Sequence, residues 1–297
     1  MAVMQTNELF KQQLSSKGHQ LTDVELEQVK QVVFEIANDV IAICEEKNIP
    51  YMLGGGTALG AVRHQGFIPW DDDIDLNIER QYIDILLDEI EKRHGQKYFV
   101  EAPLRTPGYL SSFIQIHKRG TILQEYLVKK GDENGIKIDI FVIENTYDNP
   151  IKRIWHGFCC ELGLFVLSCY RMYLWREEFI MLADGNKKAL LLIKIKGAFG
   201  RLIAPFGEYW YRRVQLCLQR CRNNKSRYIS IPSGRKHFFG ETYERNSFMQ
   251  TIPMRFENKK FHVTKDYDSY LSNLYGDYMQ LPAENKREHH VIYKLKF

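Results

Sequence analysis

The sequence predicts an α+β protein in which a mixed sheet with flanking helices is interrupted by a helical insertion rich in basic and aromatic residues. Three observations support this fold class. Helical and strand-like patterns alternate over the first 145 residues, aromatic, leucine and cysteine residues become frequent after residue 150, and strand-like alternation returns in the last 60 residues. The chain has 297 residues, 44% of them apolar and 26% charged, which is enough material for a sizeable core. We expect an N-terminal arm at residues 1–20, a core domain at 21–150 and a helical subdomain at 151–230. A C-terminal segment at 231–297 is expected to complete the core domain.

The elements of the core domain follow from capping and spacing signals. Thr22 and Glu25 form a capping box, and apolar residues at helical spacing predict a helix from there to about Glu46, which Pro50 ends. The next predicted elements are a buried strand, a short helix, an amphipathic helix and two more strands, at residues 51–53, 57–64, 81–94, 113–117 and 136–142. Strand-like alternation at 238–261 and a helix at 267–275 close the chain.

The helical insertion carries a concentrated positive charge. Residues 154–210 are expected to be helical, and residues 186–237 hold thirteen lysine and arginine residues against one acid, Glu208, for a net charge of +12, although the whole chain carries only +4. Basic residues interleaved with apolar ones are typical of a contact with an anionic membrane surface. The alternative is a basic subdomain that packs on the core and binds a phosphorylated donor. Nucleic acid is not an expected partner, because the sequence has no helix-turn-helix or ribonucleoprotein signature.

Other features of the sequence exclude several classes of protein. We find no signal-peptide pattern and no uninterrupted apolar run near the roughly 18 residues that span a bilayer. The six cysteines form no Cys-x-x-Cys pair, so we interpret them as reduced and mostly buried in a cytosolic protein. Cys217 and Cys221 have a spacing that suits a metal, but no further His or Cys pair is spaced to complete a tetrahedral site.

The most informative segment is residues 54–78, where a glycine turn precedes a cluster of carboxylates. The acids are Asp71, Asp72, Asp73 and Asp75, and the last two alternate with apolar residues as in a strand. Asp73 and Asp75 would then share one face, where two carboxylates repel each other unless a cation or a proton lies between them. Oxygen ligands of this kind suit a hard divalent ion such as Mg²⁺. An acidic triplet alone would more often be a solvated turn, but the alternation and the upstream glycines favour a functional site.

A third acid and the glycines complete this predicted site. Asp139, flanked by isoleucines in a predicted strand, is the best third carboxylate for two-metal phosphoryl transfer, ahead of Glu144; its alternative is an ordinary acid at a strand edge. A turn without side chains lets backbone N–H groups approach a phosphate at the start of the following helix. The residues expected to make this phosphate contact are Gly55, Gly56 and Thr57.

Two further residues near the acids each have two interpretations. Arg63 could neutralise a phosphate or hold Asp71 or Asp72 in place. Trp70 could fill the core or form a stacking platform for a base or a choline-like cation. The other aromatics that could build a cage for choline are Tyr109, Tyr126, Trp155 and Trp175.

Residues 53–75, LGGGTALGAVRHQGFIPWDDDID, closely resemble the signature of the LicD family, which includes bacterial phosphocholine transferases and is related to fukutin-type polyol-phosphate transferases. Residues 136–141 are similar to the third-aspartate strand of that family. Residues 275–287, followed by His289 and His290, are similar to its C-terminal motif. The resemblance implies a nucleotidyltransferase-like fold and transfer of a phospho-substituent from a CDP-activated donor to a sugar hydroxyl, with release of CMP.

By position, the resemblance makes Asp73, Asp75 and Asp139 the metal-binding and catalytic acids, and it makes Asp71 and Asp72 supporting acids. The sequence departs from the family pattern at one place. A Lys-x-Arg pair is expected where this chain has Gln115-Ile116-His117, so either the basic role moves to Lys118 or Arg119, or the donor differs.

Together these observations predict a transferase that depends on Mg²⁺, with Mn²⁺ as the alternative ion, and that modifies a glycan or a lipid-linked glycan precursor of the cell surface, in teichoic acid, capsule or lipopolysaccharide. Such a protein would be cytoplasmic and peripheral at the inner face of the cell membrane. One rival is a nucleotidyltransferase that adds NMP from an NTP to a small molecule and releases pyrophosphate. The other is a membrane-associated scaffold without catalysis, which the presence of all three acids argues against.

Overall fold

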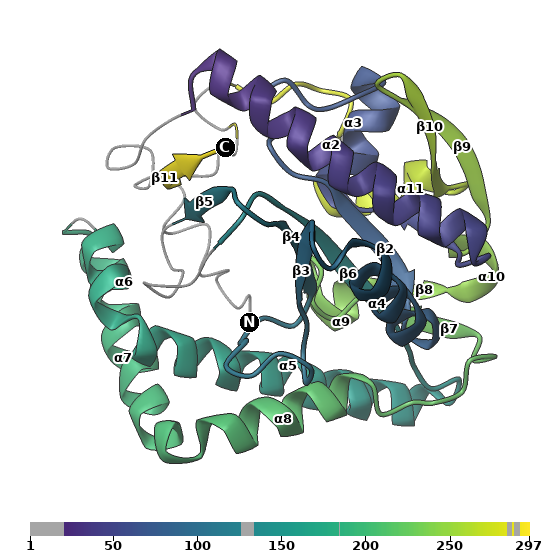
Figure 1. The fold of residues 1–297 in the computed structure, drawn as a ribbon. Coiled ribbons are helices and arrows are strands. Elements are labelled where there is room, and N and C mark those ends of the chain that lie inside the picture. The colour runs from purple at the N-terminus through teal and green to yellow at the C-terminus, as the bar shows by residue number, and fades with distance from the viewer. Residues whose placement is uncertain (1–20, 126–133, 184, 284–286, 288–291) are drawn as a thin grey trace.

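The computed structural model describes residues 21–125, 134–183, 185–283, 287 and 292–297. The expected arm at 1–20 lies outside the described residues, as do Tyr126, His289 and His290. The described chain has the predicted architecture, a sheet of parallel and antiparallel strands with flanking helices (Figure 1).

The central sheet has five strands along its main path. Their order is β1 (Tyr51–Leu53), β2 (Asp75–Glu79), β6 (Lys137–Asn145), β4 (Ile114–Lys118) and β3 (Tyr98–Glu101). Strands β2 and β6 are parallel, whereas the other neighbours pair antiparallel. The late strand β7 (Tyr228–Ser230) pairs with the end of β6, and β8 (Thr242–Glu244) pairs with β7. The segment after the helical insertion therefore returns to the same sheet.

Two helices, α2 (Asp23–Glu46) and α4 (Arg80–His94), cover one face of this sheet. The capping box predicted at Thr22 begins α2: the Thr22 side chain accepts from the Glu25 N–H, and the Glu25 side chain accepts from the Thr22 N–H. The strands place apolar side chains under these helices, among them the fully buried Leu76, Ile116 and Ile140. The opposite face of the same strands is left for polar side chains.

The insertion forms four helices: α5 (Pro150–Leu174), α6 (Arg176–Ala183), α7 (Lys187–Ile203) and α8 (Gly207–Leu218), with a 3-10 turn at Ala204–Phe206. They gather along one side of the molecule, at the bottom and left of Figure 1. They bury small apolar clusters of their own, apart from the main core, around Met172, Cys160 and Leu167. By length and composition α5 could cross a membrane, although core helices of soluble proteins also pass this test; 28% of its most apolar window is buried.

The remaining elements close the fold around the short helix α3 (Gly55–His64). They are the hairpin β9-β10 (Thr251–Phe256, Lys259–Thr264), the pair β5-β11 (Ile122–Glu125, Ile292–Lys296), the short helices α9 (His237–Gly240) and α10 (Arg245–Phe248), and α11 (Tyr267–Tyr275). Helix α11 has the predicted bounds and packs against α3.

Several elements differ from the sequence prediction. Strands β3, β5, β7 and β11 were not predicted, and β7 lies at the end of the segment 151–230 that was expected to be helical. Short helices α9 and α10 interrupt the strand-like region at 238–261. Strand β2 begins at Asp75, so Asp73 precedes it, although exposure still alternates from Asp73 to Leu76 as in an extended chain. Helix α3 begins at Gly55, two residues before the predicted start, since tertiary contacts override the poor helix propensity of glycine.

Candidate active site

The centre of the site is a row of polar side chains across three neighbouring strands. In the parallel pair of β2 and β6, Asp75 lies directly opposite Asp139, and in the antiparallel pair of β6 and β4, Asp139 lies opposite Gln115. Residues in register on neighbouring strands point to the same face and lie about 5 Å apart. The Gln115 side-chain amide donates a hydrogen bond of 3.0 Å to Asp139 Oδ1. The sheet thus brings together two carboxylates that are far apart in sequence and fixes the orientation of one of them.

The glycine turn lies against these carboxylates. A Cβ atom on Gly55 would sit 2.9 Å from Asp75 Oδ2, and one on Gly56 would sit 3.0 Å from Asp71 Oδ2. Gly55 also has a φ of +41°, which disfavours any residue with a side chain. A side chain at either glycine would therefore displace a carboxylate, and the positive end of the helix faces the negative charges.

Backbone and side-chain hydrogen bonds lock the turn to the start of β2. The Gly54 N–H donates to the Asp75 carbonyl oxygen at 2.9 Å, and the Asp75 N–H donates to Thr57 Oγ1 at 2.8 Å. Thr57 is 3% exposed, so its hydroxyl acts as an internal brace. Asn77, two residues along β2, fills the space beside Gly54, where a Cβ would meet its amide at 2.9 Å.

Two tyrosines of α11 form a wall of the site that sequence reasoning missed. The Gly55 N–H donates to the Tyr270 hydroxyl at 3.0 Å, and Asn77 Nδ2 donates to the same oxygen at 3.4 Å. The Tyr275 hydroxyl lies 3.6 Å from the position of a Cβ on Gly55. Burial raises the pKa of both hydroxyls, and the charge of Asp75 raises the pKa of both further, so both remain neutral hydrogen-bonding groups. The motif at 275–287 was the only sequence signal for this wall.

A basic loop also approaches this wall. The Arg235 guanidinium carbon lies 5.1 Å from the centre of the Tyr275 ring, and its charge counters the rise in the pKa of that tyrosine. Glu241, only 2% exposed, accepts a hydrogen bond of 2.8 Å from the Lys236 N–H. Burial raises the pKa of Glu241 to about 7, although the nearby cations Arg235 and Lys236 oppose the rise.

The other acids of the cluster have different surroundings. Asp71 and Asp73 are half-buried, whereas Asp72 is 8% exposed. Asp71 lies beside Gly56, the third glycine of the turn, and Asp73 stands two residues before Asp75 in the extended segment that leads into β2. The donor set is thus made of carboxylate oxygens next to a turn with no room for side chains. Carboxylate oxygens are the ligand type that suits a hard divalent cation, and the structure sets two of the three predicted acids, Asp75 and Asp139, side by side.

Arg63 and Trp70 lie beside the C-terminal part of the chain. Arg63 donates to the Tyr278 carbonyl oxygen at 2.6 Å and to His64 Nε2 at 2.9 Å, and burial lowers its pKa. Trp70 is half-buried against the main core, with the Arg287 guanidinium 4.4 Å from the centre of its ring. The structure therefore uses Trp70 both as part of the core and as a platform for a cation from its own chain.

The structure does not bring Lys118 and Arg119 to the acids. Lys118 is three positions beyond Gln115 on β4, so it points to the opposite face, where its ammonium group forms an ion pair with Glu35 of α2 at 2.5 Å. The Arg119 guanidinium lies over the Phe99 ring and donates to the carbonyl oxygens of Gly95 and Tyr98. The position where a basic pair was expected instead holds Gln115, which binds Asp139.

Comparison with known proteins gives three informative similarities. Residues 48–158 match the family model described as LicD/FKTN/FKRP, nucleotidyltransferase domain. The chain is 26% identical to the lipopolysaccharide cholinephosphotransferase LicD of Haemophilus influenzae over 259 residues, which cover 84% of this chain and 90% of that protein. A segment of 44 residues is 48% identical to the ribitol 5-phosphate transferase FKRP of human and mouse, covering 15% of this chain and 9% of those proteins. These matches confirm the resemblance drawn from the sequence and the prediction of a phosphotransferase.

Proposed function

We propose, on the premise that this chain is a phosphotransferase with a LicD-type nucleotidyltransferase domain, that it transfers phosphocholine or a polyol phosphate from a CDP-activated donor to a sugar hydroxyl. The acceptor is a cell-surface glycan or its lipid-linked precursor, and CMP is released. The observation that carries this proposal is the pairing of Asp75 with Asp139 in register beside the glycine turn. The names of the relatives, a cholinephosphotransferase and a ribitol 5-phosphate transferase, support both the transferred groups and the glycan acceptor.

A divalent ion, Mg²⁺ or Mn²⁺, is part of this proposal. Asp73, Asp75 and Asp139 would hold it, and Asp71 and Asp72 would support the site from the segment before β2. When bound, such an ion neutralises the donor diphosphate and favours departure of CMP. Of the three predicted phosphate contacts, the Gly55 N–H donates to the Tyr270 hydroxyl, so the N–H groups of Gly56 and Thr57, at the positive end of α3, are the proposed donors to a phosphate.

Asp139 is the proposed general base. The acceptor hydroxyl oxygen forms a bond to the phosphorus that carries the choline or polyol, while the bond from this phosphorus to the bridging oxygen breaks and CMP leaves with that oxygen. The hydroxyl proton passes to Asp139. The hydrogen bond from Gln115 to Oδ1 holds this carboxylate in its orientation. Arg63 and Arg235 replace Lys118 and Arg119 as the proposed cations at the site, since both lie beside the C-terminal wall.

The proposal is tested by titration calorimetry with CDP-choline, CDP-glycerol, CDP-ribitol and ATP, each with and without Mg²⁺. The wild type should bind one CDP donor in a Mg²⁺-dependent way, and Asp75→Asn should lose this binding. Asp84→Asn, an exposed aspartate on α4, is the control and should bind as the wild type does. Binding of ATP alone, with pyrophosphate as the product, would instead favour a nucleotidyltransferase. Absence of metal binding, together with full function in Asp73→Asn, would favour a non-catalytic scaffold.

A membrane location is part of the same proposal. Helices α5 and α7 each carry an exposed apolar stripe at helical spacing, with Ile151, Trp155, Phe158 and Leu162 on α5 and Leu191, Ile195, Phe199 and Leu202 on α7. The insertion that carries these stripes is also the most basic part of the chain. Apolar residues flanked by lysine and arginine suit peripheral binding to an anionic membrane surface. We therefore place the enzyme at the cytoplasmic face of the cell membrane, where a lipid-linked acceptor would be within reach.

A further inference from the structure

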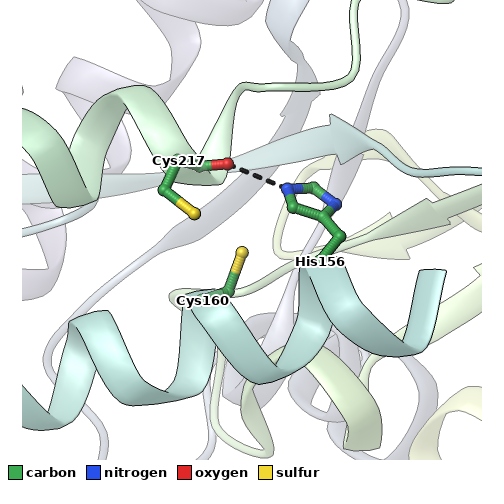
Figure 2. A group of neighbouring side chains, drawn as sticks. All are labelled: His156, Cys160 and Cys217. Atoms are coloured by element: carbon green, nitrogen blue, oxygen red, sulfur yellow. Dashed lines mark hydrogen bonds between the residues drawn. The ribbon is translucent and has the colours of Figure 1, made fainter. Parts of the chain in front are cut away.

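A second cluster of metal-binding side chains lies between the helical insertion and the sheet. Helix α5 presents His156 and Cys160 one turn apart on one face, and Cys217 approaches them from the end of α8 (Figure 2). One potential ligand atom from each residue lies within 4.8 Å of the other two. His156 is 3% exposed and Cys160 is fully buried. We propose that these three side chains form a zinc site, separate from the site of the carboxylates.

The choice of zinc follows from the ligand types and their spacing. Two cysteine sulfurs and an imidazole nitrogen are soft and borderline ligands, which select zinc over magnesium or calcium. Around a tetrahedral zinc ion, two sulfur ligands lie about 3.8 Å apart, so the cluster needs to contract by about 1 Å at most. The sulfur atoms of Cys160 and Cys217 point toward each other in Figure 2.

The two ring nitrogens of His156 have different hydrogen-bond partners. Nε2, on the side of the ring that faces Cys217 in Figure 2, donates to the Cys217 carbonyl oxygen at 2.8 Å. Nδ1 lies 3.3 Å from Thr146 Oγ1. When zinc binds Nε2, the ring proton moves to Nδ1 and is donated to the Thr146 hydroxyl. A protein acceptor on the second nitrogen is the usual way in which metal-binding histidines are oriented. The Cys217 carbonyl oxygen or a water molecule supplies the fourth ligand.

The surroundings also favour a bound cation with thiolate ligands. The positive charges of Arg220 and Arg213 act on Cys217 and favour its thiolate, the form that binds metals. The rings of Tyr147 and Phe238 pack edge-on against the imidazole and shield it from water. Cys221, which the sequence paired with Cys217, does not belong to this cluster.

The site would join the insertion to the catalytic strand. Thr146 directly follows β6, the strand that carries Asp139, while the three ligands belong to α5 and α8. The apolar cluster at this junction is small, with Cys160, Leu218 and Phe238 as its buried members. A zinc ion here would therefore join α5 to the end of α8, and its ligand His156 would be linked to the sheet through Thr146.

The test is a cobalt titration of reduced, metal-free protein, followed by absorption spectroscopy. We expect saturation at one Co²⁺ per chain, with a sulfur-to-cobalt charge-transfer band that Zn²⁺ abolishes. Protein purified without chelators should contain one zinc ion, and its removal should lower Tm by several degrees. Mg²⁺ at the carboxylates gives no sulfur band, so the result is independent of the proposed reaction.

Matched variants localise the site. Cys217→Ser and His156→Gln should lose the band or shift it strongly, whereas Cys221→Ser, which removes another buried cysteine after α8, should keep it. If a variant does not fold, the wild-type spectrum decides alone. Absence of the band in reduced wild type would overturn the proposal, as would an unchanged band in folded Cys217→Ser.

Discussion

The contact between the glycine turn and Asp75 makes a sharp prediction for Gly55→Ala. The new Cβ would lie 2.9 Å from Asp75 Oδ2, whereas ordinary contacts begin at 3.4 Å, so the carboxylate must move by about 0.5 Å. A displacement near this size at a reacting centre is expected to reduce kcat/KM by roughly 10- to 100-fold. The φ of +41° adds a cost of about 1–2 kcal/mol for a residue with a side chain. This corresponds to a fall in Tm of roughly 2–6 °C.

The assay is release of CMP from the CDP donor that calorimetry identifies, with Tm measured on the same samples. Gly185→Ala is the matched control, because Gly185 has a φ of +81° and a Cβ there would meet nothing within 4 Å. It should lose similar stability and keep full activity. If Gly55→Ala keeps wild-type kcat/KM while its Tm falls as in the control, the reasoning about the carboxylate position is wrong.

Three further predictions concern the base, a buried acid and the membrane surface. Asp139→Asn should reduce kcat by about 10²- to 10⁴-fold without unfolding the protein, as measured by CMP release and circular dichroism; activity near that of the wild type would remove Asp139 as the base. Burial raises the pKa of Glu241 from 4.5 to about 7, so the folded state holds a proton that the unfolded state has released, and stability should fall as pH rises from 4.5 to 7. Urea unfolding should show this fall in the wild type and a flatter profile in Glu241→Gln, and equal profiles would contradict it. Ile195→Ser on α7 should weaken sedimentation with anionic vesicles, while Ile85→Ser on α4, a residue of almost the same exposure (52% against 51%), should not; equal effects would refute the proposed surface.

Much of the site could be predicted because its main motif is local. The motif consists of the glycine turn, the short helix and the acids at 71–75, which lie within about twenty residues. Residue type and spacing within this segment are enough to predict its local structure. Capping at Thr22 and helical spacing likewise predicted α2 and α11, whose apolar faces follow a period that is visible in the sequence. Strands β3 and β5 were missed because each has only four residues and depends on its partner strands for its hydrogen bonds.

Lys118 and Gln115 show where local reasoning failed. Both lie on β4, and the sequence alone gave the basic role to Lys118 or Arg119, which follow the expected position, or else predicted a different donor. A strand alternates its faces, so an offset of three residues turns Lys118 toward α2 and Glu35 while Gln115 remains beside Asp139. The face of a strand that borders a site is the face that the helices leave uncovered. Which face that is depends on how the helices pack on the sheet, and the sequence of the strand alone does not show it.

The sequence by itself determined which kinds of residue are available: a glycine turn, a cluster of carboxylates, and a basic, apolar insertion. These follow from residue type and short spacing, which do not depend on how the chain is folded. Only the tertiary structure decided which groups meet. It set Asp139 opposite Asp75 across parallel strands, placed Tyr270 on the amide of Gly55, and assembled His156, Cys160 and Cys217 from two helices. Such pairings join residues that are up to 215 positions apart, and their register is fixed by the packing of the whole core rather than by any local pattern.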